Sequence, residues 1–167
     1  MSHKPSRHTI LSIAPSTRGF GFALVEDKAL IDWGCKTVKG EKNAATLAKV
    51  RKLIDLYTPT MLVIQDYSAR PTRRAERIRQ LGVAMGWLAT DYKLTLKLVA
   101  QVKVQRVFFG KRRATKQEIA QALASRFPQE LVPLLPPKRK PWMPQHPRMD
   151  MFDAIALAVA QAHARKG

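Results

Sequence analysis

The sequence predicts an α/β domain with a mixed sheet, in which an antiparallel three-strand meander is joined by parallel strands and flanked by helices. In the first forty residues, three apolar runs are separated by short turns, which is typical of a meander. After them, segments with helical spacing alternate with short apolar runs. The chain has 167 residues, 46% of them apolar, which is enough for one compact domain with a core.

The meander is expected near the N-terminus. Its strands are Thr9–Ile13, Phe20–Val25 and a third strand formed by Ala29–Trp33 and Cys35–Val38, interrupted at Gly34. Cys35 is the single cysteine, so a disulfide framework is excluded. We expect it to lie in the third strand as a small apolar residue.

The later elements follow from apolar spacing and from capping signals. Two short apolar runs predict strands at 61–64 and 95–99, and helical spacing predicts helices at 44–57, 72–90, 115–126 and 151–163. Thr115 and Glu118 have the spacing of a capping box, which gives Glu118 a structural role.

Two further segments complete the expected organisation. Six prolines between Pro133 and Pro147 predict a loop without regular structure around Trp142. We therefore expect residues 1–8 to form a basic tail and residues 9–167 a single domain that carries this proline-rich loop at 133–147.

The charge is strongly basic, with 30 Lys and Arg against 12 Asp and Glu and a net charge of +18. The excess gathers in three clusters: Arg70, Arg73, Arg74, Arg77 and Arg79; Lys103, Arg106, Lys111, Arg112, Arg113 and Lys116; and Lys138, Arg139 and Lys140. Several such side chains bind phosphates together and release counterions from a nucleic acid. These clusters make a polyanion the expected partner. No apolar stretch is long enough to span a membrane, and the expected location is the cytoplasm.

Three segments carry a resemblance. Ile10–Val25 reads ILSIAPSTRGFGFALV, Leu62–Tyr67 reads LVIQDY, and Asp150–Ala160 reads DMFDAIALAVA. In this order, they resemble the first hairpin, the central strand and the closing helix of the RuvC family of Holliday-junction resolvases. Lys103 and Lys116 match the family's DNA-contacting lysines. The resemblance implies an RNase H-like fold, a homodimer, and DNA lying over the face near the family's carboxylates.

The departures from the family bear on catalysis. Family members hydrolyse a phosphodiester with two metal ions held by carboxylates. Here the first aspartate of the motif falls on Ala14 and the central glutamate on Gln65. Asp150 and Asp153 remain, on one helical face, and are expected to hold a metal ion weakly or not at all. Asp66 follows Gln65, but strand alternation turns it to the other face unless a bulge intervenes.

Charge and resemblance together predict a non-catalytic, RuvC-like protein that binds branched or structured DNA as a homodimer, with no cofactor. The source is expected to be bacterial, phage or plasmid, and the location cytoplasmic and nucleoid-associated. The loop at 133–147 has no counterpart in the family pattern and is a candidate docking site for a protein partner. The expected DNA-binding residues are Arg70, Arg73, Arg74, Arg77, Lys103, Lys111, Arg112, Arg113 and Lys116.

Two alternatives remain open. One is a metal-dependent junction endonuclease that uses Mg²⁺ or Mn²⁺ at Asp66, Asp150 and Asp153, either naturally atypical or deliberately inactivated. Ser16, which replaces a family glycine beside Ala14, favours natural loss. The other is a dimeric protein-interaction factor whose DNA affinity is incidental.

Overall fold

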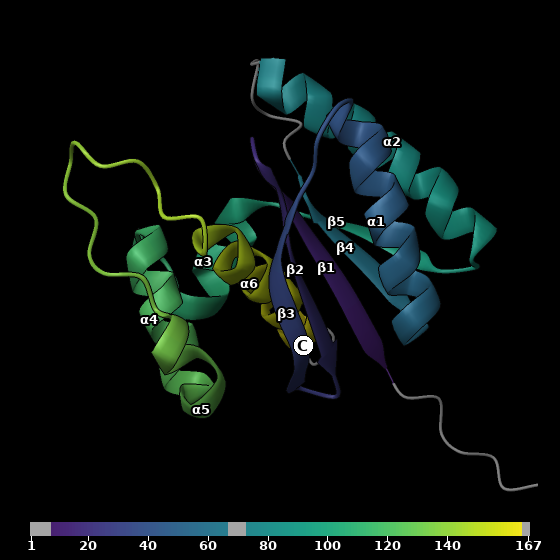
Figure 1. The fold of residues 1–167 in the computed structure, drawn as a ribbon. Coiled ribbons are helices and arrows are strands. Elements are labelled where there is room, and N and C mark those ends of the chain that lie inside the picture. The colour runs from purple at the N-terminus through teal and green to yellow at the C-terminus, as the bar shows by residue number, and fades with distance from the viewer. Residues whose placement is uncertain (1–7, 67–72, 165–167) are drawn as a thin grey trace, which may run out of the picture.

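A computed structural model describes residues 8–66 and 73–164. They form one five-stranded sheet in the order β3-β2-β1-β4-β5. Helices α1 and α2 cover one face, and α6, with α3 and α4 beside it, covers the other (Figure 1). The predicted α/β fold with a mixed sheet is confirmed. Of the expected basic tail, residues 1–7 lie outside the described residues.

The strands are β1 (Thr9–Pro15), β2 (Gly19–Glu26), β3 (Ala29–Thr37), β4 (Met61–Gln65) and β5 (Thr95–Val99). Strands β1 to β3 form the expected antiparallel meander, and β4 runs parallel to both β1 and β5.

The predicted interruption of the third strand at Gly34 is wrong. Gly34 pairs with Phe22 inside a continuous strand, and the register shift of this pairing lies between Leu24 and Val25. A Cβ at Gly34 would lie 3.1 Å from the Phe22 ring, so the glycine makes room for that ring rather than ending the strand. Cys35 does lie in β3, but it is exposed, because β3 is an edge strand.

The helices are α1 (Lys42–Tyr57), α2 (Arg73–Asp91), α3 (Gln101–Phe109), α4 (Lys116–Arg126), α5 (Pro128–Leu131) and α6 (Met149–Ala164), with a 3₁₀ turn η1 (Val132–Leu134). Helix α3 was not predicted, because the alternation of Val102 and Val104 with polar residues is equally typical of a strand. Apart from Pro133 and Leu134 in η1, the loop at 133–147 lacks helix and strand up to Pro147, as predicted. Among the residues described, no helix is long and apolar enough to cross a membrane.

The N-terminal turn of α6 lies unusually close to the sheet. A Cβ on Gly21 of β2 would lie only 1.9 Å from the carbonyl oxygen of Asp150, so this approach requires glycine. The buried hydroxyl of Ser12 on β1 donates a 2.5 Å hydrogen bond to the carbonyl of Ala154. These two contacts fix the acidic start of α6 against β1 and β2.

Candidate nucleic-acid interface

Ala14 and Gln65, the positions at which carboxylates were missing from the sequence motifs, lie at the same end of the sheet as the start of α6. Ile13 pairs with Ile64 in the parallel β1–β4 ladder, which places Ala14 and Gln65 one residue further on neighbouring strands. Ala14 belongs to the core under α6, and alternation from Val63 directs Gln65 to the same face. Asp150 is 9% exposed and Asp153 lies one turn later on α6.

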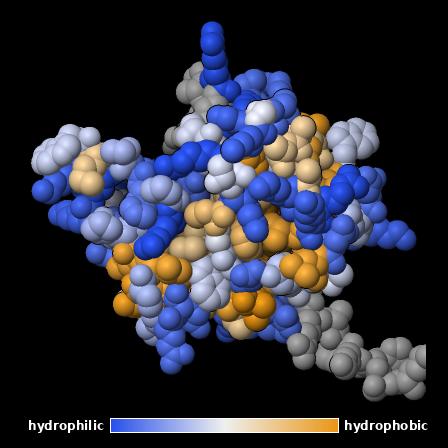
Figure 2. All heavy atoms as spheres, viewed as in Figure 1, coloured by the Kyte–Doolittle hydropathy of each residue, from blue (hydrophilic) through white to orange (hydrophobic). Residues whose placement is uncertain are grey.

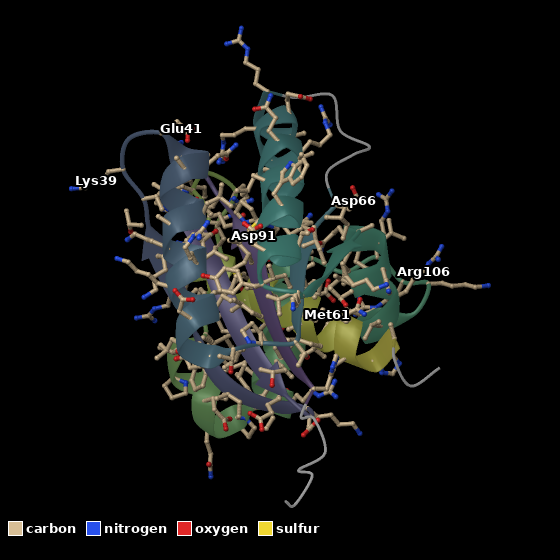
Figure 3. All side chains as sticks on the ribbon, turned by 90° about the vertical axis from the view of Figure 1, so that its right-hand side faces the viewer. Lys39, Glu41, Met61, Asp66, Asp91 and Arg106 are labelled. Carbon is tan, nitrogen blue, oxygen red and sulfur yellow. The ribbon has the colours of Figure 1, made fainter. Side chains whose placement is uncertain are left out.

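Asp66 directly follows the last residue of β4, and Met61 is the first residue of the same strand (Figure 3). Its backbone N–H donates to the carbonyl of Val99 over 2.9 Å, so the β4–β5 ladder continues through Asp66 without a bulge. Alternation therefore gives Asp66 the face opposite to that of Gln65. Throughout residues 8–66 and 73–164, no three His, Cys, Asp or Glu side chains gather as a metal-binding group, and Asp66, Asp150 and Asp153 are all within that range.

Asp153 forms an ion pair with the lysine side chain of Lys116. The Lys116 Nζ donates to Asp153 Oδ2 over 2.9 Å, from the first residue of α4 across to α6. Both side chains are partly exposed. The ammonium group thus offsets the charge of one of the two carboxylates at the start of α6, Asp150 and Asp153.

Cys35 borders the same end of α6. Its thiol donates weakly to the carbonyl of Pro147 over 3.5 Å. Partial burial raises the pKa of Cys35, and the negative charge of Asp150 raises it further. The raised pKa disfavours the thiolate, which is the nucleophilic form of cysteine.

The segment from α3 to α4 presents basic side chains beside this end. Lys103, Lys111 and Arg113 are exposed. Arg112 differs, because its guanidinium donates to Glu118 over 2.8 Å and lies 4.5 Å from the centre of the Phe109 ring.

Glu118 has the structural role that the sequence predicts. Thr115 and Glu118 form a complete capping box at the start of α4. The backbone N–H of Thr115 and the nearby Arg112 lower the pKa of Glu118.

Phe108 and Phe109 are both partly buried against the hydrophobic core between the sheet and α6, so packing accounts for both of these aromatic side chains.

The arginines of α2 divide into different roles. Arg73 is exposed at the start of the helix, whereas Arg70 and the side chain of Arg74 lie outside the described residues. Arg77 donates to the carbonyl of Ser16 over 3.2 Å and to Asn43 Oδ1 over 3.3 Å, so it joins the β1–β2 turn to α1. Its predicted contact with DNA stays a prediction. Ser16 itself accepts the backbone N–H of Gly19, which gives it a turn-forming role that sequence reasoning missed.

A groove of about 560 Å³ lies between α4 and the proline-rich loop, a feature that the sequence did not reveal. The loop projects from the α6 side of the sheet (Figure 1), and the projecting part is mainly hydrophilic, with a hydrophobic patch below it (Figure 2). The basic residues lining the groove are Lys116, Lys138 and Arg139. The detectable signal in the sequence was the third basic cluster, which lies in a segment without acidic residues.

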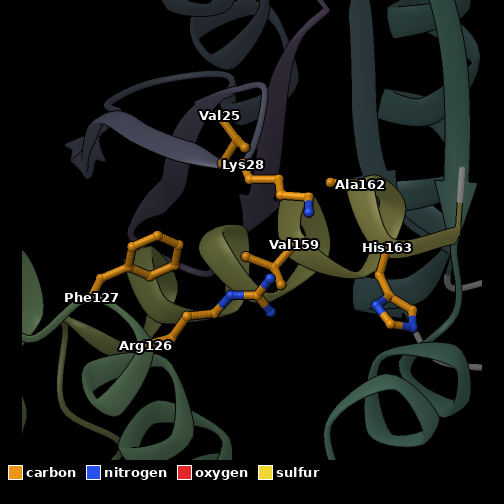
Figure 4. A pocket seen from close by; sticks show the side chains of 7 residues that line it. All are labelled: Val25, Lys28, Arg126, Phe127, Val159, Ala162 and His163. Carbon is orange, nitrogen blue, oxygen red and sulfur yellow. The ribbon is translucent and has the colours of Figure 1, made fainter. Parts of the chain in front are cut away.

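A much smaller cavity, of about 70 Å³, lies at the other end of α6. Lys28, Arg126 and His163 line it (Figure 4). Because His163 follows Asp150 by more than three helical turns, this cavity is separate from the acidic start of α6.

No family model matches the chain. Similarity to individual proteins is found both in sequence and in structure. Crossover junction endodeoxyribonuclease RuvC from Chromohalobacter salexigens is 24% identical over 178 residues, covering 100% of this chain and 87% of that protein. RuvC from Thermus thermophilus superposes with a TM-score of 0.69 at 16% identity, covering 95% of this chain and 96% of that one. The same protein in complex with a Holliday junction substrate gives 0.66 at 17%, covering 96% of each chain.

Proposed function

We propose that this chain, a homologue of the RuvC resolvases by sequence and by fold, binds branched DNA of the Holliday-junction type without cleaving it. The relative of known structure is described in complex with a Holliday junction substrate. The net charge of +18 supports the same partner class.

The absence of cleavage rests on the chemistry at the end of the sheet. A two-metal mechanism needs several carboxylates to hold the ions and neutralise their charge. Ala14 has no ligand atom, Gln65 has no charge, and Lys116 already pairs with Asp153. We therefore propose that the protein uses no cofactor, and that Mg²⁺ or Mn²⁺ has a role only if the endonuclease alternative holds.

The test is one binding reaction with a labelled four-way junction, excess unlabelled duplex and Mn²⁺, divided between a native and a denaturing gel. A junction that is shifted on the first gel and intact on the second supports the proposal. Nicked product would refute it and would make Asp66→Asn the next variant. A junction that is neither shifted nor nicked would favour the protein-interaction factor.

The pair formed by Lys116 and Asp153 has a measurable consequence. In Asp153→Asn the lysine loses its charged partner, so DNA phosphates no longer compete with a carboxylate for it. We expect affinity for a four-way junction to rise by about three- to tenfold, and the salt dependence of binding to steepen by about one ion. Fluorescence anisotropy across a salt series measures both.

Asp91→Asn is the matched control, because it removes an exposed acid at the far end of α2 with the same change in net charge. If both variants gain affinity equally, the effect is one of net charge and the specific pairing has no part in it. If Asp153→Asn instead weakens binding in a metal-dependent manner, Asp153 is a metal ligand.

We further propose a homodimer that forms through the outer face of α2. Val83 and Trp87, one turn apart on this helix, are 65% and 72% exposed, and Leu98 on the neighbouring β5 is also exposed. Large apolar side chains exposed on neighbouring elements commonly mark an interface. We expect Val83→Glu/Trp87→Glu to halve the mass measured by light scattering, while Leu56→Glu, at an exposed leucine of α1, leaves it unchanged. A monomeric unmodified protein would contradict this proposal.

The proposed location follows from the proposed ligand: a junction-binding protein of this kind would be nucleoid-associated in the cytoplasm. A protein partner at the loop 133–147 stays a prediction, and the tests of this loop below bear on it.

A further inference from the structure

Trp142, like Trp87, is a large side chain that the fold leaves exposed. It is 77% exposed at the tip of the proline-rich loop. The N–H of Met143 donates to the carbonyl of Lys140 over 2.9 Å, which closes a turn in which Pro141 and Trp142 are the central residues. Proline in the second position of such a turn fixes its backbone before any ligand binds. The indole is therefore presented to solvent on a preorganised turn.

Both sides of the loop are attached to the domain. Gln117 on α4 donates to the carbonyl of Pro136 over 3.1 Å. At the other side, the N–H of Asp150 donates to the carbonyl of Pro147 over 3.3 Å. Because of these contacts, the position of the loop relative to the acidic start of α6 is defined.

The groove beneath the loop is continuous with the acidic start of α6. Lys116 lines the groove and also holds Asp153, and Met149, which lines the groove too, directly precedes Asp150. A volume of about 560 Å³ falls in the range of about 300–1,000 Å³ that is usual for pockets holding a small-molecule ligand.

The charge of the loop favours a nucleic acid. Residues 133–147 contain Lys138, Arg139 and Lys140 and no acidic residue. The Lys140 ammonium lies 5.4 Å from the centre of the Trp142 ring, and this leaves the ring's other face open to stacking. Base stacking on an aromatic side chain requires an unpaired base, and a basic groove that follows the backbone completes a single-strand site.

We propose that the groove and the proline-rich loop bind a single DNA strand leaving the branch point, with its phosphates at Lys116, Lys138 and Arg139 and an unpaired base stacked on Trp142. This inference rests on the proposed function and extends it, because it names a single-stranded arm as part of the preferred substrate. A fully paired junction would engage the α3–α4 segment but leave Trp142 unused.

The test measures binding of three labelled probes to the full chain by anisotropy: a short oligothymidylate, a fully paired four-way junction, and the same junction with a single-stranded arm. We expect Trp142→Ala to weaken binding of the oligothymidylate and of the armed junction about tenfold or more. Binding of the fully paired junction should change less than twofold. Trp142→Phe should retain most of the affinity, because the smaller ring still stacks.

The basic side chains are tested in the same way. Lys138→Ala/Arg139→Ala should lower the affinity for the oligothymidylate and its salt dependence, whereas Lys52→Ala/Lys93→Ala, which removes two exposed lysines near α1 and α2, should not. Equal affinity of Trp142→Ala and the unmodified protein for the two single-stranded probes would overturn the inference, as would an oligothymidylate that does not bind. Either result would favour an acidic protein segment as the ligand of the groove and loop. If the unmodified protein does not bind the fully paired junction, the proposed function itself is refuted.

Discussion

Ala14→Asp/Gln65→Glu is expected to nick four-way junctions in Mn²⁺, whereas the unmodified protein is expected to bind them without cleavage. The two new carboxylates would lie on adjacent strands, on the α6 face of the sheet and beside Asp150 and Asp153. Four carboxylates there meet the requirement of a two-metal site, and Asp153 then exchanges Lys116 for a metal ion. The expected change is from no detectable product to metal-dependent product on a denaturing gel.

Thermal unfolding provides a readout that does not depend on cleavage. Ala14 is 3% exposed, so an aspartate there is destabilising without a metal ion, because a buried charge lacks a partner. If Mn²⁺ binds at a hundred times its dissociation constant, it contributes about 2.7 kcal/mol. We therefore expect Mn²⁺ to raise the Tm of the double variant by about 5 °C or more. The unmodified protein should show no such rise.

Gln65→Glu alone serves as the second variant if the double variant does not fold, because position 65 is only partly buried. It should gain a smaller Mn²⁺-dependent rise in Tm. Failure of both variants to respond to Mn²⁺ would mean that Asp150 and Asp153 no longer have the geometry of a metal site, and that catalysis was lost at more than two positions. Nicking by the unmodified protein would contradict the proposed function.

Charge reversal on the α3–α4 segment is expected to abolish most junction binding. Lys103, Lys111 and Arg113 are exposed, and among the residues that the structure describes, no hydrogen bond or ion pair holds their side chains. Replacing all three with Glu would remove the three proposed phosphate contacts and add repulsion. We expect the affinity to fall by about a hundredfold or more at low salt, and the slope of log K against log salt to become shallower by about three.

The control must change the net charge equally. Lys28→Glu/Lys52→Glu/Lys93→Glu does so at three exposed lysines outside the α3–α4 segment, and a loss of only a few-fold is expected there. Equal losses in the two triple variants would mean that DNA is attracted by net charge alone, without a defined interface. Circular dichroism of both variants establishes that each remains folded.

The order of the elements could be predicted from the sequence because local patterns determine it. The apolar runs of β1 and β2, the apolar spacing in α1 and α6, and the capping box of Thr115 can each be recognised within a few residues. Helix α3 was missed because its short apolar pattern fits two periods. The third strand was divided wrongly at Gly34 because the neighbouring Phe22 ring, which explains the glycine, lies on a different strand.

The sequence alone determined which chemical groups are present at the candidate site. Ala14 and Gln65 stand where the RuvC family has carboxylates, two aspartates remain three residues apart, and basic residues are in excess. Tertiary structure decided what those groups contact. The pairing of Lys116 with Asp153 spans 37 residues, the anchoring of Arg77 to Ser16 spans 61, and the groove needs α4 and the proline-rich loop side by side. Such contacts depend on how elements pack across the sheet, and periodicity within one segment carries no information about its neighbours in space.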